Sequence, residues 1–131
     1  MAGVIVLDAS VLIAYLDDSD ANHDPATALL EREIEEDFAA SSLTLAEVLV
    51  GPTRAGRVPD ALVALEDLEV SELPFPPEAS VKLAELRVRT GLRMPDCCVL
   101  LVAHERQARV ASLDVGLNGG AAKIGLEVVA P

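Results

Sequence analysis

The sequence predicts an α/β fold in which a parallel sheet of four to five strands is flanked by helices. Short apolar runs typical of buried strands alternate along the chain with longer segments of helical periodicity. Strands that alternate with helices pair in parallel through crossover connections. The chain has 131 residues, enough for one well-packed core and too few for two, so we expect a single domain over residues 1–131.

The first elements are the clearest, because their apolar runs are short and well separated. Residues 4–7 read as a strand buried on both faces, and a short apolar helix is expected at 10–16. Residues 22–37 have a proline near their start and apolar residues at helical spacing as far as Ile34, which predicts a second helix with an acidic face. A brief second strand is expected at 38–40.

The middle of the chain is interrupted by helix-breaking residues. Residues 41–52 predict a helix that Gly51 and Pro52 disturb or end, because both residues are unfavourable inside helices. A shorter helix is expected at 59–68 and a third strand at 69–74.

The last third contains the longest helices. Prolines begin the predicted helix 76–92, and Gly91 ends it. A helix at 94–107 also starts with a proline. A strand at 109–114 ends on an acidic residue, and after a glycine-rich segment a final strand is expected at 126–130.

Four acidic residues lie where the chain leaves a predicted strand or enters a predicted helix. Asp8 follows the first strand, Glu47 falls in the first turn of a helix, Asp96 lies at a helix start, and Asp114 ends a strand. In sheets of this class ligands bind at the carboxyl ends of the strands. We therefore expect all four carboxylates on one edge of the sheet.

A purely structural interpretation exists for each acid. Asp8 is suited to an N-cap, Asp96 to the positive end of a helix dipole, Thr44 with Glu47 to a capping box, and Asp114 to a turn. Caps need no particular neighbours in space, whereas a hard divalent cation needs several oxygen ligands together. The combination of four acids therefore favours Mg²⁺ or Mn²⁺.

Other metal and redox chemistries receive little support. His23 and His104 are the only histidines, and neither lies near the four acids in the predicted elements. The only cysteines, Cys97 and Cys98, are adjacent, which suits neither a disulfide nor a zinc site, and their helical position predicts buried thiols.

Charge and composition limit how the chain could bind nucleic acid. The net charge is −12 and aromatic residues make up 2%, so base stacking is excluded and any nucleic acid would be held by its backbone. Eight of the ten cations lie between Arg54 and Arg109, and the candidate phosphate contacts among them are Arg54, Arg57, Lys82, Arg87, Arg89 and Arg93. The N-terminal segment resembles neither a signal peptide nor a membrane span, so we expect a cytoplasmic protein with no membrane partner.

Two other folds with acidic pockets were compared with these residues. A haloacid-dehalogenase-type phosphatase needs a second aspartate two places after the first, where this chain has Ser10. A response-regulator receiver needs paired acids at one strand end, an acceptor aspartate on the central strand and a late lysine, a place for which only Lys123 is available. Both folds fit less well than a metal-binding acidic edge.

Four segments in order, "VIVLDASVLIAYL", "SLTLAEVLVG", "RMPDCCVLLVA" and "VASLDVGL", closely resemble the PIN-domain nucleases and, at this length, the VapC-type toxin ribonucleases. The resemblance implies a three-layer α/β domain with one or two Mg²⁺ or Mn²⁺ ions. It implies that Asp8, Glu47, Asp96 and Asp114 surround the metal, with Ser10 as a supporting contact. The chain departs from the family at Leu117, where an aromatic residue is common, and Asn118 is a further accessory candidate.

The same resemblance implies a function. The protein is expected to be a metal-dependent endoribonuclease that hydrolyses RNA as the toxin of a type II toxin-antitoxin system. Its implied partners are an RNA substrate, a small cognate antitoxin protein and a second copy of itself in a homodimer. The alternative is a non-catalytic acidic α/β binding module that docks a basic protein partner, with the acids serving only as caps.

Overall fold

The computed structural model describes residues 3–131, which form five strands and seven helices. All strand pairs are parallel, and the order across the sheet is β3-β2-β1-β4-β5. The strands are β1 (Val4–Leu7), β2 (Asp37–Ser41), β3 (Ser71–Leu73), β4 (Arg109–Ala111) and β5 (Val128–Val129). The helices are α1 (Ala9–Leu16), α2 (His23–Arg32), α3 (Ser42–Arg54), α4 (Val58–Asp67), α5 (Ala79–Thr90), α6 (Met94–Arg106) and α7 (Val115–Lys123). The predicted α/β class with a parallel sheet is confirmed.

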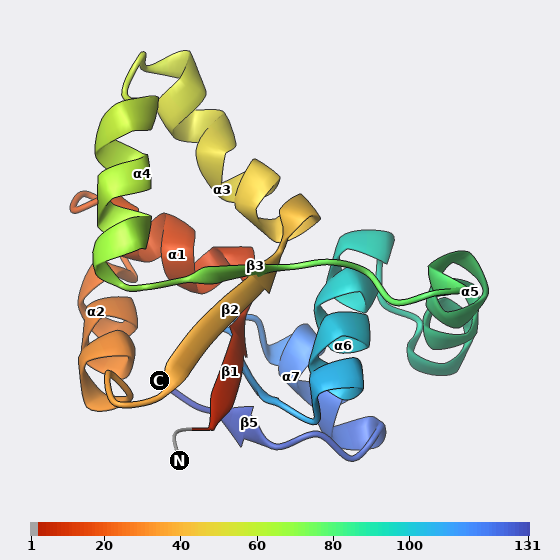
Figure 1. Cartoon of the computed structure of the whole chain (residues 1–131). Helices are drawn as coiled ribbons and strands as arrows, with labels where there is room; N and C mark the ends of the chain where they lie inside the picture. The colour runs from red at the N-terminus through yellow and green to blue at the C-terminus, as the bar shows by residue number, and fades with distance from the viewer. Residues whose placement is uncertain (1–2) are drawn as a thin grey trace.

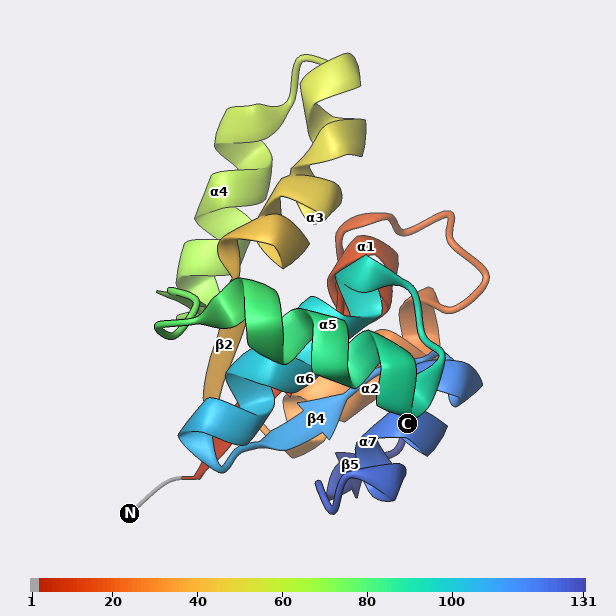
Figure 2. The same ribbon diagram turned by 90° about the vertical axis from the view of Figure 1, so that its right-hand side faces the viewer.

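Helices cover both faces of the sheet and give the molecule three layers. Figure 1 shows α1 and α2 on one side of the strands and α5, α6 and α7 on the other. The pair α3 and α4 extends beyond the ends of the strands, as Figure 2 also shows. Within residues 3–131 we find no helix that combines the length and apolar character needed to cross a bilayer.

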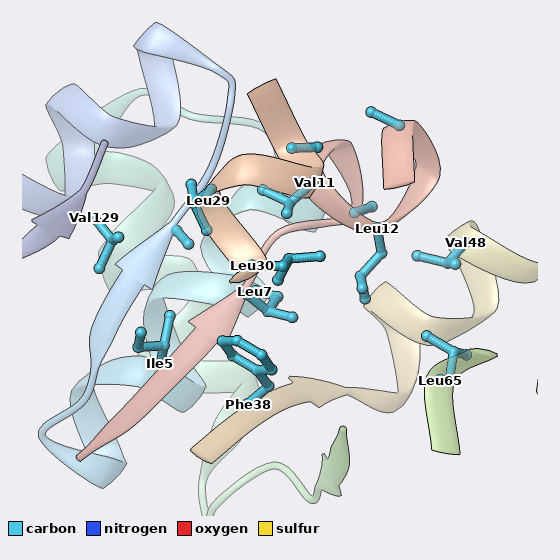
Figure 3. Close-up of a cluster of buried hydrophobic side chains, with 14 residues drawn as sticks. Ile5, Leu7, Val11, Leu12, Leu29, Leu30, Phe38, Val48, Leu65 and Val129 are labelled. Carbon is cyan, nitrogen blue, oxygen red and sulfur yellow. The ribbon is translucent and has the colours of Figure 1, made fainter. Parts of the chain in front are cut away.

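The core lies on both sides of the central strand β1, because successive side chains of a strand point to opposite faces. Ile5 and Leu7 pack with Phe38 in one cluster, against α1 and α2 (Figure 3). Val6 points to the other face and joins a second cluster with Leu100 of α6. Burial on both faces explains why β1 is a continuous apolar run.

The direction in which successive strands are added to the sheet changes between β1 and β4. From β1 the sheet grows through β2 to β3 on one side, and β4 and β5 are added on the other. Such a switch point leaves a crevice at the carboxyl ends of the two strands, because the connections leave in opposite directions. Asp8 follows β1 directly at this place, and Leu7 pairs with Ala111 of β4 beside it.

The ends of helices α2 and α3 differ from the prediction. Helix α2 ends at Arg32, and Ile34 lies beyond it with 52% of its surface exposed, because the chain must turn before β2 pairs with β1. Helix α3 continues through Gly51 and Pro52 to Arg54. Proline there removes only one backbone hydrogen bond close to the end of the helix, so the helix tolerates it.

Helix α7 was not expected, because its segment is rich in glycine, which lowers helix propensity. It forms because Asp114 caps its start and because Leu117 and Ala121 are buried in the second core cluster. Strand β4 also ends at Ala111, three residues before Asp114. Asp114 therefore begins a helix rather than ending a strand, which corrects its predicted local setting.

Candidate active site at the switch point

Asp8 occupies the N-cap position of α1 but does not cap it. Its backbone is extended (φ −80°, ψ 155°), and its side chain accepts no hydrogen bond from the helix amides. Instead Oδ2 accepts hydrogen bonds from Ser10 Oγ at 2.8 Å and from Ser112 Oγ at 2.7 Å. The capping interpretation therefore fails for Asp8, whose half-buried carboxylate is held across the switch point between β1 and β4.

Ser112 is a residue of this site that the sequence analysis missed. It is fully buried directly after β4, and its Oγ accepts a hydrogen bond from the Asp114 amide at 2.9 Å. Ser10 Oγ similarly accepts from the Leu113 amide at 3.0 Å. Each serine thus joins the Asp8 carboxylate to the β4–α7 loop. One signal was present in the sequence: Ser112 is two residues before Asp114, and Ser10 is two residues after Asp8. The sequence does not show, however, that the two serines are neighbours, because only the pairing of β1 with β4 brings them together.

Glu47 lies in the second turn of α3, not in the first turn as expected. The N-cap is Ser41, whose Oγ accepts a hydrogen bond from the Thr44 amide at 3.2 Å, so the predicted capping box of Thr44 and Glu47 is not formed. Burial raises the pKa of the Glu47 carboxyl, and the nearby charges of Asp8 and Asp96 raise this pKa further. Glu47 therefore faces the other acids.

Asp96 is the third residue of α6 and is half-buried. Burial raises the pKa of its carboxyl, and the charges of Asp8 and Asp114 raise this pKa further. The Arg93 guanidinium opposes the increase. Its place in the first turn suits the helix dipole. The repulsion from two other carboxylates nevertheless places Asp96 in the same acidic neighbourhood as Asp8.

Asp114 does cap a helix. Its Oδ1 accepts hydrogen bonds from the amides of Gly116 at 2.8 Å and Leu117 at 3.3 Å, in the first turn of α7. The side chain is exposed, and its charge acts on Asp96. Asp114 is therefore a helix cap and is also an electrostatic neighbour of Asp96.

We call Asp8, Glu47, Asp96 and Asp114 the acidic edge. Their charges influence one another across three helices and a strand end, as expected for neighbours at one edge of a sheet. Within residues 3–131, however, no three acidic, histidine or cysteine side chains are arranged so that they could hold a metal ion as they stand. The four acids are thus close enough to influence one another's charge but are not arranged as a preformed metal site.

The donor chemistry of the acidic edge fits a hard divalent cation. The groups present are carboxylates and hydroxyls, which Mg²⁺ and Mn²⁺ prefer. Asn118 adds a carbonyl oxygen, Oδ1, that is buried without a hydrogen-bond partner, while its Nδ2 donates to the Ser112 carbonyl at 3.0 Å. Carboxylates that repel one another and an unsatisfied buried acceptor are both stabilised by a cation or its water.

A groove leads away from Glu47 between α1, α3 and α4. It has a volume of about 780 Å³, and apolar residues such as Ile13 and Val50 line it. Its charged lining is mostly acidic, and its cation Arg57 forms an ion pair with Asp60 at 3.4 Å. The further acidic residues lining the groove are Asp17, Asp18 and Glu47.

Comparisons with solved structures agree on the fold. A toxin-antitoxin complex from Klebsiella pneumoniae is 21% identical with a TM-score of 0.77, and the alignment covers 95% of both chains. VapC20 from Mycobacterium tuberculosis, a sarcin-ricin loop cleaving toxin, is 19% identical with a TM-score of 0.72, covering 88% of this chain and 93% of that chain. VapBC2 from Rickettsia felis, bound to a DNA fragment from its promoter, is 14% identical with a TM-score of 0.70 and 98% coverage of both.

No curated protein matches the chain. The family model of the PIN domain matches residues 5–121, a range that includes β2, β3 and β4 and all of β1 except Val4. The match thus spans most of the sequence and agrees with the fold. The chain belongs to the PIN domain family.

Proposed function

We propose that the protein is a metal-dependent endoribonuclease that hydrolyses RNA phosphodiester bonds as the toxin of a type II toxin-antitoxin system. The observation that carries the proposal is the acidic edge, where burial raises the pKa values of Glu47 and Asp96 and the neighbouring carboxylates raise them further. Crowded acids at a switch point are costly unless a cation offsets their charge. The resemblance of the fold to solved toxin structures supports this assignment.

The residues of the acidic edge have distinct proposed roles. Asp8 and Asp96 bind Mg²⁺ or Mn²⁺ directly, and Glu47 is the next ligand. Asp114 binds through Oδ2 or through a water, because its Oδ1 caps α7. The two serines hold Asp8 by Oδ2, so its other carboxylate oxygen would be the one that binds the cation.

The cation supplies Lewis acidity, which activates water for attack and offsets charge on the phosphate. The chain supplies the geometry. Ser10 and Ser112 fix the rotamer of Asp8, so little reorganisation is needed when the ligands assemble. The rigid starts of α6 and α7 carry Asp96 and Asp114 to the same edge.

The test is Asp8→Asn, compared with Asp67→Asn at the exposed end of α4. Asparagine keeps the shape of the side chain, and its amide oxygen can still accept the hydrogen bonds of Ser10 and Ser112, so folding is preserved. Loss of a metal ligand is expected to lower RNA cleavage in Mn²⁺ by about 100-fold. Millimolar Mn²⁺ should raise the melting temperature of the wild-type protein and of Asp67→Asn but not of Asp8→Asn. Cleavage by Asp8→Asn at the wild-type rate would show the assignment to be wrong.

A small antitoxin that presents a basic, partly apolar segment is the proposed protein partner. The groove beside Glu47 offers apolar walls and uncompensated acids, which attract opposite charge. A synthetic basic amphipathic peptide should therefore inhibit RNA cleavage. Asp17→Asn with Asp18→Asn should weaken that inhibition, and unchanged inhibition by the double variant would place the contact elsewhere.

The proposed homodimer is supported by α5, which has no buried residue in the single chain. Its Val81 and Val88 are 58% and 87% exposed. Exposed apolar side chains on one helix face are suited to a self-association surface. Val88→Glu should then shift the mass measured by light scattering from dimer to monomer, and a wild-type mass of one chain would exclude the dimer.

The alternative of a non-catalytic acidic module that docks a basic protein is favoured by one observation, the acidic groove. It predicts no thermal stabilisation by Mn²⁺ and unaltered partner binding by Asp96→Asn. The same Mn²⁺ titration therefore separates the two functions.

A further inference from the structure

Arg93 lies next to the acidic edge, at the start of α6. It is the N-cap residue of α6, its side chain is exposed, and Asp96 follows three positions later in the first turn of the same helix. Among residues 3–131, no carboxylate is within ion-pairing distance of its guanidinium. The guanidinium is therefore available to another anion.

Arg93 also lies within electrostatic range of two members of the acidic edge, Glu47 on α3 and Asp96 on α6. Several other cations are paired elsewhere. Arg57 is bound to Asp60, and Lys82 is bound to Glu105.

The turn that carries Arg93 is held in place from both sides. Arg87 Nη1 donates a hydrogen bond to the Leu92 carbonyl at 2.6 Å, and Gly91 adopts the left-handed conformation (φ 73°) that ends α5. The Leu92 side chain packs so closely on α7 that a Cβ atom at Gly120 would lie 2.4 Å from its Cδ1. The backbone of Arg93 is thus fixed relative to α7 and the acids.

We propose that Arg93 binds a phosphate of the RNA substrate at the acidic edge, next to the bond that is cut. This inference rests on the proposed function. A guanidinium on an anchored turn offers paired donors to phosphate oxygens, a geometry that an ammonium group does not reproduce. RNA approaching a cluster of carboxylates also needs a nearby positive charge that is not itself one of the ligands.

The position of Arg93 gives it two effects of opposite sign. It attracts the phosphate, and it repels the divalent cation that the acids are proposed to hold. Removing its charge should weaken binding of RNA while strengthening binding of Mn²⁺. A residue that only supports the fold would weaken both.

The experiment compares Arg93→Gln with Arg106→Gln. Arg106 is an exposed arginine in the last turn of α6, at the opposite end of this helix from Arg93 and Asp96. Single-turnover cleavage of a labelled RNA gives the half-saturating protein concentration and the maximal rate, and Mn²⁺ affinity is read separately from the melting temperature without RNA. For Arg93→Gln we expect the half-saturating concentration to rise about 5- to 10-fold.

The same variant should bind Mn²⁺ more tightly, with the midpoint of the thermal titration at a lower concentration than in the wild type. The salt dependence of RNA binding should fall by a slope of about 0.7, the value for one lost phosphate contact on a single strand. Arg106→Gln should leave the half-saturating concentration and the Mn²⁺ midpoint unchanged. Arg93→Lys should restore the Mn²⁺ midpoint but only part of the RNA affinity.

The outcomes separate this inference from the proposed function. If the wild type cleaves RNA and Arg93→Gln has the same half-saturating concentration as Arg106→Gln, the inference is wrong and the nuclease assignment stands. If Arg93→Gln loses RNA and Mn²⁺ affinity together, Arg93 is a structural residue. A wild-type protein that does not cleave RNA in Mn²⁺ overturns both.

Discussion

The acidic edge depends on a few side chains whose hydrogen bonds cross the sheet. Ser10 and Ser112 both donate to the same oxygen of Asp8, although 102 positions separate them in the sequence. Both serines also accept an amide hydrogen bond from the β4–α7 loop. Their hydroxyls therefore have fixed orientations, and so does the Asp8 carboxylate.

Ser112→Ala tests this arrangement. It removes a buried hydrogen bond to a carboxylate and leaves the Asp114 amide without its acceptor, which should lower the free energy of unfolding by about 1–3 kcal/mol. Because the support of a ligand is lost, Mn²⁺ affinity should fall by about 10- to 100-fold. Urea denaturation and a Mn²⁺ thermal titration measure the two effects. Ser80→Ala on exposed α5 is the control, and equal Mn²⁺ affinity in both variants would contradict the role of Ser112.

At the scale of elements, α7 shows how packing overrides propensity. Three glycines disfavour the helix, yet the Asp114 cap and the burial of Leu117 and Ala121 stabilise it. Only one of these glycines is required by a close contact. A Cβ atom at Gly120 would lie 2.4 Å from Leu92 Cδ1, whereas the position of a Cβ at Gly119 has nothing within 4 Å.

The two neighbouring glycines therefore make a matched pair. Gly119→Ala should raise the free energy of unfolding by about 0.5–1 kcal/mol, because alanine favours the helix and restricts the unfolded chain. Gly120→Ala gains the same propensity but must displace Leu92, so it should be less stable than Gly119→Ala by about 1–3 kcal/mol. Thermal denaturation of both variants measures the difference, and equal stabilities would show that the α5–α6 turn is not held against α7.

At the scale of the whole molecule, a net charge of −12 and the crowded acidic edge make stability depend on pH. The pKa values of Glu47 and Asp96 are raised in the folded protein from ordinary values of 4.5 and 3.8. Above those ordinary values the folded protein holds more protons at these sites than the unfolded chain does. Its stability therefore falls as the pH rises through this range.

Glu47→Gln should accordingly raise the melting temperature at pH 7 in the absence of divalent cations. The gain should disappear near pH 4, where the carboxyl of Glu47 is protonated in both states. Mn²⁺ should stabilise the wild type more at pH 7 than at pH 5, because protons compete for the same oxygens. Calorimetry at these pH values measures both effects, with Glu31→Gln on exposed α2 as control. A gain that is independent of pH would mean that Glu47 does not face the other acids.

Local pattern in the sequence was enough to predict the α/β class, the parallel sheet and most of the elements. The reason is that β1 is buried on both faces and therefore apolar throughout, while the prolines and Gly91 mark helix ends. The same pattern indicated the four acids of the site. It failed at α7, where the deciding contacts are remote, and at the end of α3, where the helix tolerates Pro52 because only one backbone hydrogen bond is lost there.

The sequence by itself thus determined the order of strands and helices, the acidic charge and the residue types available at the sheet edge, because propensity and hydrophobic periodicity act over short distances along the chain. Only the tertiary structure decided that β1 lies beside β4, that Ser112 therefore holds Asp8, and that Leu92, the neighbour of Arg93, packs on Gly120 of α7. Those contacts join residues from distant parts of the chain, and their geometry exists only after the sheet has assembled.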